Sequence, residues 1–104
     1  RLLDRPDPPT ALVCVSDLAA HGALSAVAER DLRPGHDIAI TGFDDTPSAA
    51  VPGVGLTSIS QPIEQAGREV VRMVLGQLGG SGEPDTHRLL EPRLVIRSSS
   101  NPEK

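Results

Sequence analysis

Three polar segments of the sequence each follow a short apolar run, and together they could form a binding site. They are Ser16-Asp17, Phe43-Asp44-Asp45 and Ser60-Gln61. A carboxylate such as Asp44 accepts hydrogen bonds from hydroxyl groups, and each bond to a charged acceptor contributes about 1.5–3 kcal/mol. The amide of Gln61 both donates and accepts. If the apolar runs are parallel strands of one sheet, their carboxyl ends meet at one edge, where ligands bind. The pattern therefore predicts a cradle for a polyhydroxylated small molecule.

Each of these polar residues also has a structural interpretation. Ser16 is a preferred N-cap residue for a helix, and Asp17 would then interact with the positive end of the helix dipole. Asp45 precedes a Thr-Pro pair, which is typical of a solvated turn. Gln61 stands directly before a predicted helix. The sequence alone favours the structural role for these four residues, whereas for Asp44 a turn and a ligand contact are equally favoured.

The same residues do not form a catalytic or metal-binding pattern. Asp44 and Asp45 are adjacent, and adjacent residues of a regular strand point to opposite faces, so a shared role would need a bent loop. The sequence contains no Gly-x-Gly-x-x-Gly fingerprint and no evident pairing of a nucleophile with a base. Its histidines, at positions 21, 36 and 87, are too far apart for a local ligand pattern. We therefore predict that the chain is not an enzyme and that it has no metal site and no cofactor.

Apolar periodicity places the polar segments at the ends of predicted strands. Residues 11–15 form a continuous apolar run, which predicts a strand buried on both faces, as in a parallel sheet. A helical stripe follows over residues 17–31, and a second strand over 38–41 completes a right-handed parallel crossover. The remaining elements are strands over 56–59 and 94–96, a helix from Pro62 to Leu78, a flexible connection over 79–84 and a frayed tail over 98–104. The fold class is therefore α/β with a parallel sheet.

Composition sets limits on size, partners and location. With 104 residues, 38% of them hydrophobic and Phe43 the single aromatic residue, the chain can build one small aliphatic core. Its formal net charge of −4 argues against nucleic-acid binding by this segment, since phosphate contacts need a cationic face. No apolar run approaches the roughly 18 residues of a membrane span. The single cysteine, Cys14, is compatible with a reducing cytoplasm.

The number of predicted helices is too small for a complete parallel sheet. Such a sheet needs helices on both faces, and only two full helices are predicted. We therefore expect an uncovered sheet face or edge. We infer that the chain is a fragment or that a partner chain covers the gap.

Several segments, taken in order, resemble the C-terminal part of LacI/GalR-family transcriptional regulators. They are Pro9-Thr-Ala-Leu-Val-Cys-Val-Ser-Asp17, Ala20-His-Gly-Ala23, Leu32-Arg-Pro-Gly-His-Asp-Ile-Ala-Ile-Thr-Gly-Phe-Asp-Asp45, Leu56-Thr-Ser-Ile-Ser-Gln-Pro62, Gly67-Arg68 and Leu94-Val-Ile-Arg97. Each motif is short, but their order and spacing are specific and cover nearly the whole chain.

The resemblance implies a type I periplasmic-binding-protein-like fold, in which two α/β subdomains hold an effector in the cleft between them. It implies that residues 1–104 are the C-terminal portion of the effector-binding domain, incomplete as a fragment. Residues 9–59 and 88–98 would belong to the C-terminal subdomain, and the helix over 62–78 to the N-terminal subdomain. The DNA-binding head of the family, a helix-turn-helix domain, would be absent from this chain.

The resemblance also implies roles for single residues. Asp44 matches the family aspartate that binds polar groups of the effector. Ser16 stands where the family usually has Asn, which would weaken or alter that contact, and Gln61 matches a polar residue near the hinge that faces the cleft. The positions that match the family's dimer interface are His21, Ala50, Val51 and Pro52. For His21, a partly exposed helix position without a special role is the simpler interpretation.

The function implied by the resemblance is regulation of transcription. A cytoplasmic homodimer would bind a small effector, either a sugar or a nucleobase-like molecule. Binding would shift the orientation of the subdomains and thereby change the affinity for DNA, which only the missing head contacts. The alternative is an extracytoplasmic sugar-binding protein of an uptake system, which shares the fold.

Overall fold

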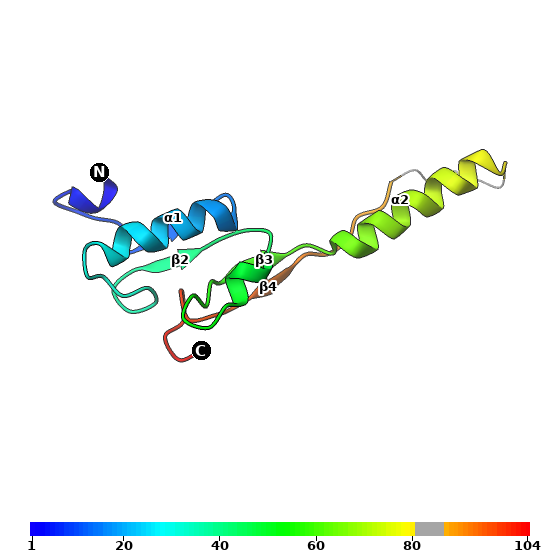
Figure 1. Ribbon diagram of the computed structural model, residues 1–104. Helices are drawn as coiled ribbons and strands as arrows, with labels where there is room; N and C mark the ends of the chain where they lie inside the picture. The colour runs from blue at the N-terminus through cyan, green and yellow to red at the C-terminus, as the bar shows by residue number, and fades with distance from the viewer. Residues whose placement is uncertain (81–86) are drawn as a thin grey trace. The chain divides into compact units, whose positions relative to one another are not determined.

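Figure 1 shows a computed structural model of the chain, which describes residues 1–80 and 87–104. The chain forms two compact units. The first consists of residues 1–60 and 93–104, and the second consists of residues 61–92. The connection predicted over residues 79–84 lies mostly outside the described residues, which end at Gly80 and resume at His87.

The first unit is built on a strand–helix–strand crossover, as predicted. β1 (Ala11–Val13) and β2 (Ala39–Thr41) pair in parallel, with Leu12 opposite Ile40. α1 (Asp17–Ala28) connects the two strands and packs beside them (Figure 1). The core is small and wholly aliphatic, in line with the composition. Its buried side chains are Ala20, Val27, Ile38, Ile40, Ala49 and Leu56.

β3 (Ser58–Ser60) continues the parallel arrangement beyond β2. Thr41 forms a parallel bridge with Thr57, and Asp44 forms one with Ser60. β4 (Arg93–Val95) pairs with β3 in the antiparallel sense, so the last predicted strand exists but does not extend the parallel sheet. The connection explains its direction. The chain leaves the first unit at the end of β3 and re-enters it at the start of β4, so the two strands run in opposite directions.

The prediction that the first strand is buried on both faces is wrong for this chain. Leu12 and Cys14 pack against the core, whereas Val13 and Val15 are 87% and 86% exposed. Successive side chains of a strand point to opposite faces, and within this chain only one of those faces is covered. The uncovered apolar face expected from the small number of helices therefore lies along β1.

Two element ends also differ from the prediction. α1 ends at Ala28 because Asp31 adopts a left-handed conformation with φ of +56°, and the amide of Leu32 donates to the carbonyl of Val27 at 3.0 Å. The tail after β4 is anchored rather than frayed, since Ser99 is buried. Its hydroxyl donates to the carbonyl of Ile40 at 2.6 Å and accepts from the amide of Thr57 at 2.8 Å.

The second unit contains α2 (Ile63–Leu78), which begins directly after Pro62. None of its side chains is buried. Six of its large apolar side chains are between 48% and 79% exposed; they are Ile63, Val70, Val71, Val74, Leu75 and Leu78. Among residues 1–80 and 87–104, no helix combines the length and the apolar character needed to cross a membrane.

Candidate functional site

The carboxyl ends of three neighbouring segments lie side by side in the first unit. The amide of Asp17 donates to the carbonyl of Phe43 at 2.9 Å, and the amide of Asp44 donates to the carbonyl of Ile59 at 3.0 Å. The polar segments that follow β1 and β2 are thus joined to each other and to β3 by backbone hydrogen bonds. Of the residues predicted to form a site, Ser16 and Asp44 belong to the first unit, whereas Gln61 is the first residue of the second unit.

Ser16 caps α1, as its structural interpretation predicts. Its backbone is extended, with φ of −153°, and its Oγ accepts a hydrogen bond from the amide of Ala19 at 3.2 Å. This bond satisfies one of the amides that a helix leaves without an internal partner at its N-terminus. Ser16 is half-buried, and it directly precedes Asp17, whose amide donates to the carbonyl of Phe43 on the edge that carries Asp44.

Asp17 has a larger role than the helix-dipole interaction that its sequence position suggests. It is only 1% exposed, and its carboxylate accepts three hydrogen bonds from outside α1. Ser58 Oγ donates to Oδ1 at 2.5 Å, and Thr46 donates to Oδ2 through its amide at 2.7 Å and through its Oγ1 at 3.0 Å. Asp17 therefore ties the start of α1 to β3 and to the loop after β2.

The hydrogen bonds keep this buried carboxyl ionised. Burial by itself would raise the pKa of Asp17, because a charged group is disfavoured away from water. The hydrogen bonds from Ser58 and from the amide and hydroxyl of Thr46 outweigh burial and lower the pKa below its ordinary value of 3.8, and the nearby His21 adds to the lowering. A carboxylate without these donors would not be stable in this position.

The loop after β2 carries two consecutive residues with positive φ. The values are +111° for Asp44 and +52° for Asp45, a region that residues other than glycine rarely adopt. The prediction of a solvated turn at Asp45 is wrong. Its Oδ1 accepts from Arg97 Nη1 at 2.7 Å, and its amide donates to Ser58 Oγ at 3.0 Å. The bent loop separates the two adjacent carboxylates, so Asp44 is exposed while Asp45 is half-buried.

A chain of hydroxyl groups extends the network from Asp17 to His21. Thr46 Oγ1 donates its proton to Asp17, so it accepts from Ser48 Oγ at 2.9 Å. Ser48 has then used its only proton, and His21 Nε2, at 2.9 Å from Ser48 Oγ, must be the donor in that bond. The network therefore fixes a proton on Nε2 of His21.

Sequence and structure comparisons connect this geometry with known proteins. Residues 1–100 match the family model of the periplasmic binding protein-like domain. The HTH-type transcriptional repressor CytR of Escherichia coli (strain K12) is 39% identical over 100 residues, which are 96% of this chain and 29% of that protein. A LacI-family regulatory protein from Chloroflexus aggregans is similar in structure, with a TM-score of 0.88 and 39% identity over 96% of this chain and 36% of that one.

The chain belongs to the periplasmic binding protein-like domain family. Its similarity to LacI-type regulators includes the crystal structure of the lac repressor dimer bound to operator and the anti-inducer ONPF. The TM-score is 0.79, with 33% identity, over 89% of this chain and 28% of that one. The predicted resemblance to LacI/GalR-family regulators and the predicted periplasmic-binding-protein-like fold are confirmed. This family member spans less than a third of the length of CytR.

The positions predicted to form a dimer interface belong to the first unit. His21 is hydrogen-bonded to Ser48, and the amide of Val51 donates to the carbonyl of Ser48 at 3.3 Å. Ala50, Val51 and Pro52 are exposed at the end of the short 3-10 helix η2 (Pro47–Ala50) and just after it, and His21 is half-buried.

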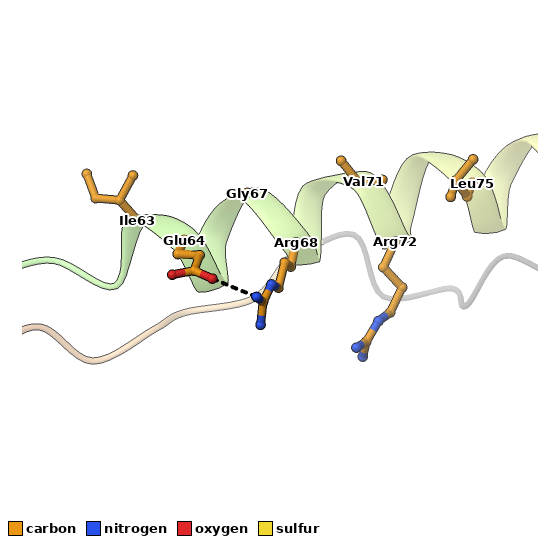
Figure 2. A pocket seen from close by; sticks show the side chains of 7 residues that line it. All are labelled: Ile63, Glu64, Gly67, Arg68, Val71, Arg72 and Leu75. Carbon is orange, nitrogen blue, oxygen red and sulfur yellow. Dashed lines mark hydrogen bonds and ion pairs between the residues drawn. The ribbon is translucent and has the colours of Figure 1, made fainter.

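Gln61, predicted to lie near a hinge, is half-buried at the start of the second unit. With Pro62, Ile63 and the first turn of α2 it lines a shallow hollow. A second, more apolar hollow follows along α2, and Figure 2 shows its lining. The hollow is lined both by the apolar side chains of Ile63, Val71 and Leu75 and by the charged side chains of Glu64, Arg68 and Arg72 (Figure 2). Glu64 and Arg68 form an ion pair at 2.6 Å.

Among residues 1–80 and 87–104, no group of three or more His, Cys, Asp or Glu side chains is arranged to hold a metal ion. The carboxylates of Asp17 and Asp45 are engaged with Ser58, Thr46 and Arg97. Asp44 is exposed on the same hydrogen-bonded edge.

Proposed function

We propose that this chain is part of the effector-sensing and dimerisation domain of a LacI/GalR-type transcriptional regulator. The observation that carries the proposal is the joined edge of three segments, on which the exposed Asp44 follows a strand aligned in parallel with its neighbours. Ligands of open α/β sheets bind at such carboxyl ends. The relatives of this chain are regulators, which favours this function over an extracytoplasmic sugar-binding protein.

We assign the first unit to the C-terminal subdomain and the helix over 62–78 to the N-terminal subdomain. The division of the chain supports this assignment, because the first unit ends at Ser60 and resumes at Arg93. A subdomain that receives one helix from a crossing chain cannot form its core from that helix alone. The exposed apolar side chains of α2 are those expected of a helix that packs against the remainder of its subdomain.

The uncovered face of the first unit supports the same assignment. Val13, Val15 and Leu18 are 83% to 87% exposed and would be covered by further strands and helices of a complete subdomain. We propose that polypeptide beyond these 104 residues covers them. A compact, cooperative monomer of residues 1–104 in sedimentation that binds no hydrophobic dye would contradict this.

In the proposed mechanism, Ser16, Asp44 and Gln61 contribute to binding one effector, a sugar or a nucleobase-like molecule. The effector shifts the equilibrium between two orientations of the subdomains only to the extent that it binds one of them more tightly. His21 and the loop over 50–52 would carry that change across the interface of a homodimer. DNA would be contacted by a helix-turn-helix head outside this chain, and the whole would act in the cytoplasm.

Replacement of Asp44 tests the proposed site. In the intact natural protein, Asp44→Ala is expected to weaken effector binding by about 2–3 kcal/mol, the contribution of hydrogen bonds to a charged acceptor. Isothermal calorimetry with a panel of monosaccharides, disaccharides, nucleosides and nucleobases would first identify a ligand and then compare the variants. Asp7→Ala removes another exposed carboxylate and is the matched control. An unchanged affinity in Asp44→Ala would remove Asp44 from the site.

Binding to DNA separates the proposed function from its alternative. A regulator of this class carries a helix-turn-helix head, and its affinity for its operator changes when effector is added. An uptake protein has no such head and is secreted. Reading the coding sequence upstream of Arg1 and measuring operator binding with and without effector would distinguish the two.

A further inference from the structure

The conformation of the loop after β2 requires an explanation that the loop itself does not contain. Asp44 and Asp45 both have positive φ, and neither is a glycine. A residue other than glycine in this region costs on the order of 1–3 kcal/mol, and it persists only where the surroundings fix it. Two such residues in succession, next to the exposed carboxylate of Asp44, indicate that something outside the loop holds it.

The amides of residues 44–46 each donate to a different acceptor outside the loop. Asp44 donates to the carbonyl of Ile59, Asp45 to Ser58 Oγ, and Thr46 to Asp17 Oδ2. The distances are 3.0, 3.0 and 2.7 Å. Three consecutive amides are thus held by β3 and by the first turn of α1. The backbone of the loop therefore has no freedom to relax to negative φ while these bonds are intact.

Two of the three acceptors are linked to each other. Ser58 Oγ donates to Asp17 Oδ1 at 2.5 Å while it accepts from the amide of Asp45. Both side chains are buried, and their hydrogen bonds join them to each other and to the loop. Gly42 leaves room for the carboxylate of Asp17, because a Cβ at this position would overlap with it.

We propose that Asp17 and Ser58 are positioning residues that act together to hold the Asp44–Thr46 loop in its left-handed conformation. They do not contact the effector in this proposal. Their function is to fix the direction in which Asp44 is presented, and in that respect the inference rests on the proposed function. The clamp that Asp17 and Ser58 form is a property of the protein without ligand. It can therefore be tested separately from effector binding.

Hydrogen exchange resolved to single amides in the ligand-free intact protein tests the clamp. For each variant, the exchange rate is measured at a loop amide whose own hydrogen-bond acceptor the substitution does not remove. Ser58→Ala keeps the acceptor of the Thr46 amide, and Asp17→Asn keeps the acceptor of the Asp45 amide. If the clamp acts as a unit, each change accelerates exchange at the distant amide by about tenfold or more, the loss of one hydrogen bond to a charged group.

A control distinguishes the clamp from general destabilisation. Ser25→Ala removes a serine hydroxyl of α1 that donates to the carbonyl of His21 and takes no part in the clamp. It is expected to leave exchange at residues 44–46 within about twofold of the natural protein, well below the effect of a lost hydrogen bond. In the clamp variants, the amide of Val27 in the core of α1 is expected to stay within the same limit.

Three outcomes are informative. Faster exchange at residues 44–46 with unchanged exchange at Val27 supports the proposal. Unchanged exchange of the Thr46 amide in Ser58→Ala overturns it, because the two residues would then act separately. An equal rise at Val27 and in the loop also overturns it, because Asp17 and Ser58 would then stabilise the unit as a whole. If Asp17→Asn does not fold, Ser58→Ala alone decides. None of these results depends on Asp44 binding an effector, which the calorimetry tests.

Discussion

Replacing Gly42 with alanine is expected to destabilise the first unit by about 3 kcal/mol, a figure that combines three effects. A Cβ at this position would overlap with Asp17 Oδ1 and lie 3.1 Å from both the Cα of Asp17 and the Cδ2 of Leu56. Overpacking of a buried site costs about 1–3 kcal/mol. Moving the carboxylate away would also break its bond from Ser58, at about 1.5–3 kcal/mol. The reduced entropy of the unfolded chain offsets about 0.4–1 kcal/mol.

Urea unfolding of the intact protein, followed by circular dichroism at constant protein concentration, measures this change. The chain provides a matched control in Gly22, which lies within α1 and would place a Cβ in open space, with no neighbouring atom within 4 Å. Gly22→Ala is expected to stabilise the protein by about 0.5–1 kcal/mol, the helix propensity difference. The two glycine-to-alanine substitutions should therefore change the free energy of unfolding in opposite directions.

The double variant identifies the group that causes the clash. If Asp17 Oδ1 is responsible, Gly42→Ala should cost at least about 1 kcal/mol less in an Asp17→Ala background than in the natural protein. Additive effects of the two changes would show that the carboxylate is not the obstacle. A Gly42→Ala protein as stable as the natural one would refute the reasoning altogether.

Three further predictions concern the polar network. The pKa of Asp17 is lower in the folded protein than the ordinary value of 3.8. The ionised carboxylate therefore stabilises the fold fully above pH 3.8, and this stabilisation is lost as the pH falls through the folded pKa. Asp17→Asn should flatten this part of an acid-unfolding curve. His21 should carry its proton on Nε2 whenever the ring is neutral, which its nitrogen-15 shifts would report, and a proton on Nδ1 alone would contradict the hydroxyl chain. Arg97→Lys should lower the free energy of unfolding in urea by about 1–2 kcal/mol, because Arg97 Nη1 donates to both Asp45 and the Leu56 carbonyl. An unchanged free energy of unfolding would show that the ion pair is dispensable.

Much of the first unit could be predicted because its elements are encoded locally. The apolar runs after Thr10 and before Gly42 have the length of strands, and the residues behind Ser16 form a helical stripe. The direction of β4 could not be predicted in this way. A strand pattern indicates which side chains face the core but not the direction of the neighbouring strand, and that direction follows from the excursion through the second unit.

The candidate site is less predictable, because its bonds join residues that are distant in the sequence. The cap at Ser16 is local, and its prediction is confirmed. The carboxylate of Asp17 has partners that lie 29 and 41 residues further along the chain, and Arg97, the partner of the Asp45 carboxylate, lies 52 residues away. In each case a local interpretation, a helix dipole or a turn, is sufficient to explain the residue type. Gly42 does indicate part of the network from the sequence, since a glycine directly after a buried strand often marks a place where another part of the chain approaches the backbone closely.

Burying the ionised Asp17 costs free energy, which raises the question of what the hydrogen-bond network contributes to the fold. An ionised carboxylate in the interior is unfavourable unless it is fully hydrogen-bonded, and an apolar residue of the same size would often give equal or greater stability. An apolar side chain at this position could not accept from the amide of Thr46, and the loop would lose one of its three anchors. The buried carboxylate therefore stabilises a conformation that hydrophobic packing cannot specify, and that conformation includes Asp44, the residue proposed to bind the effector.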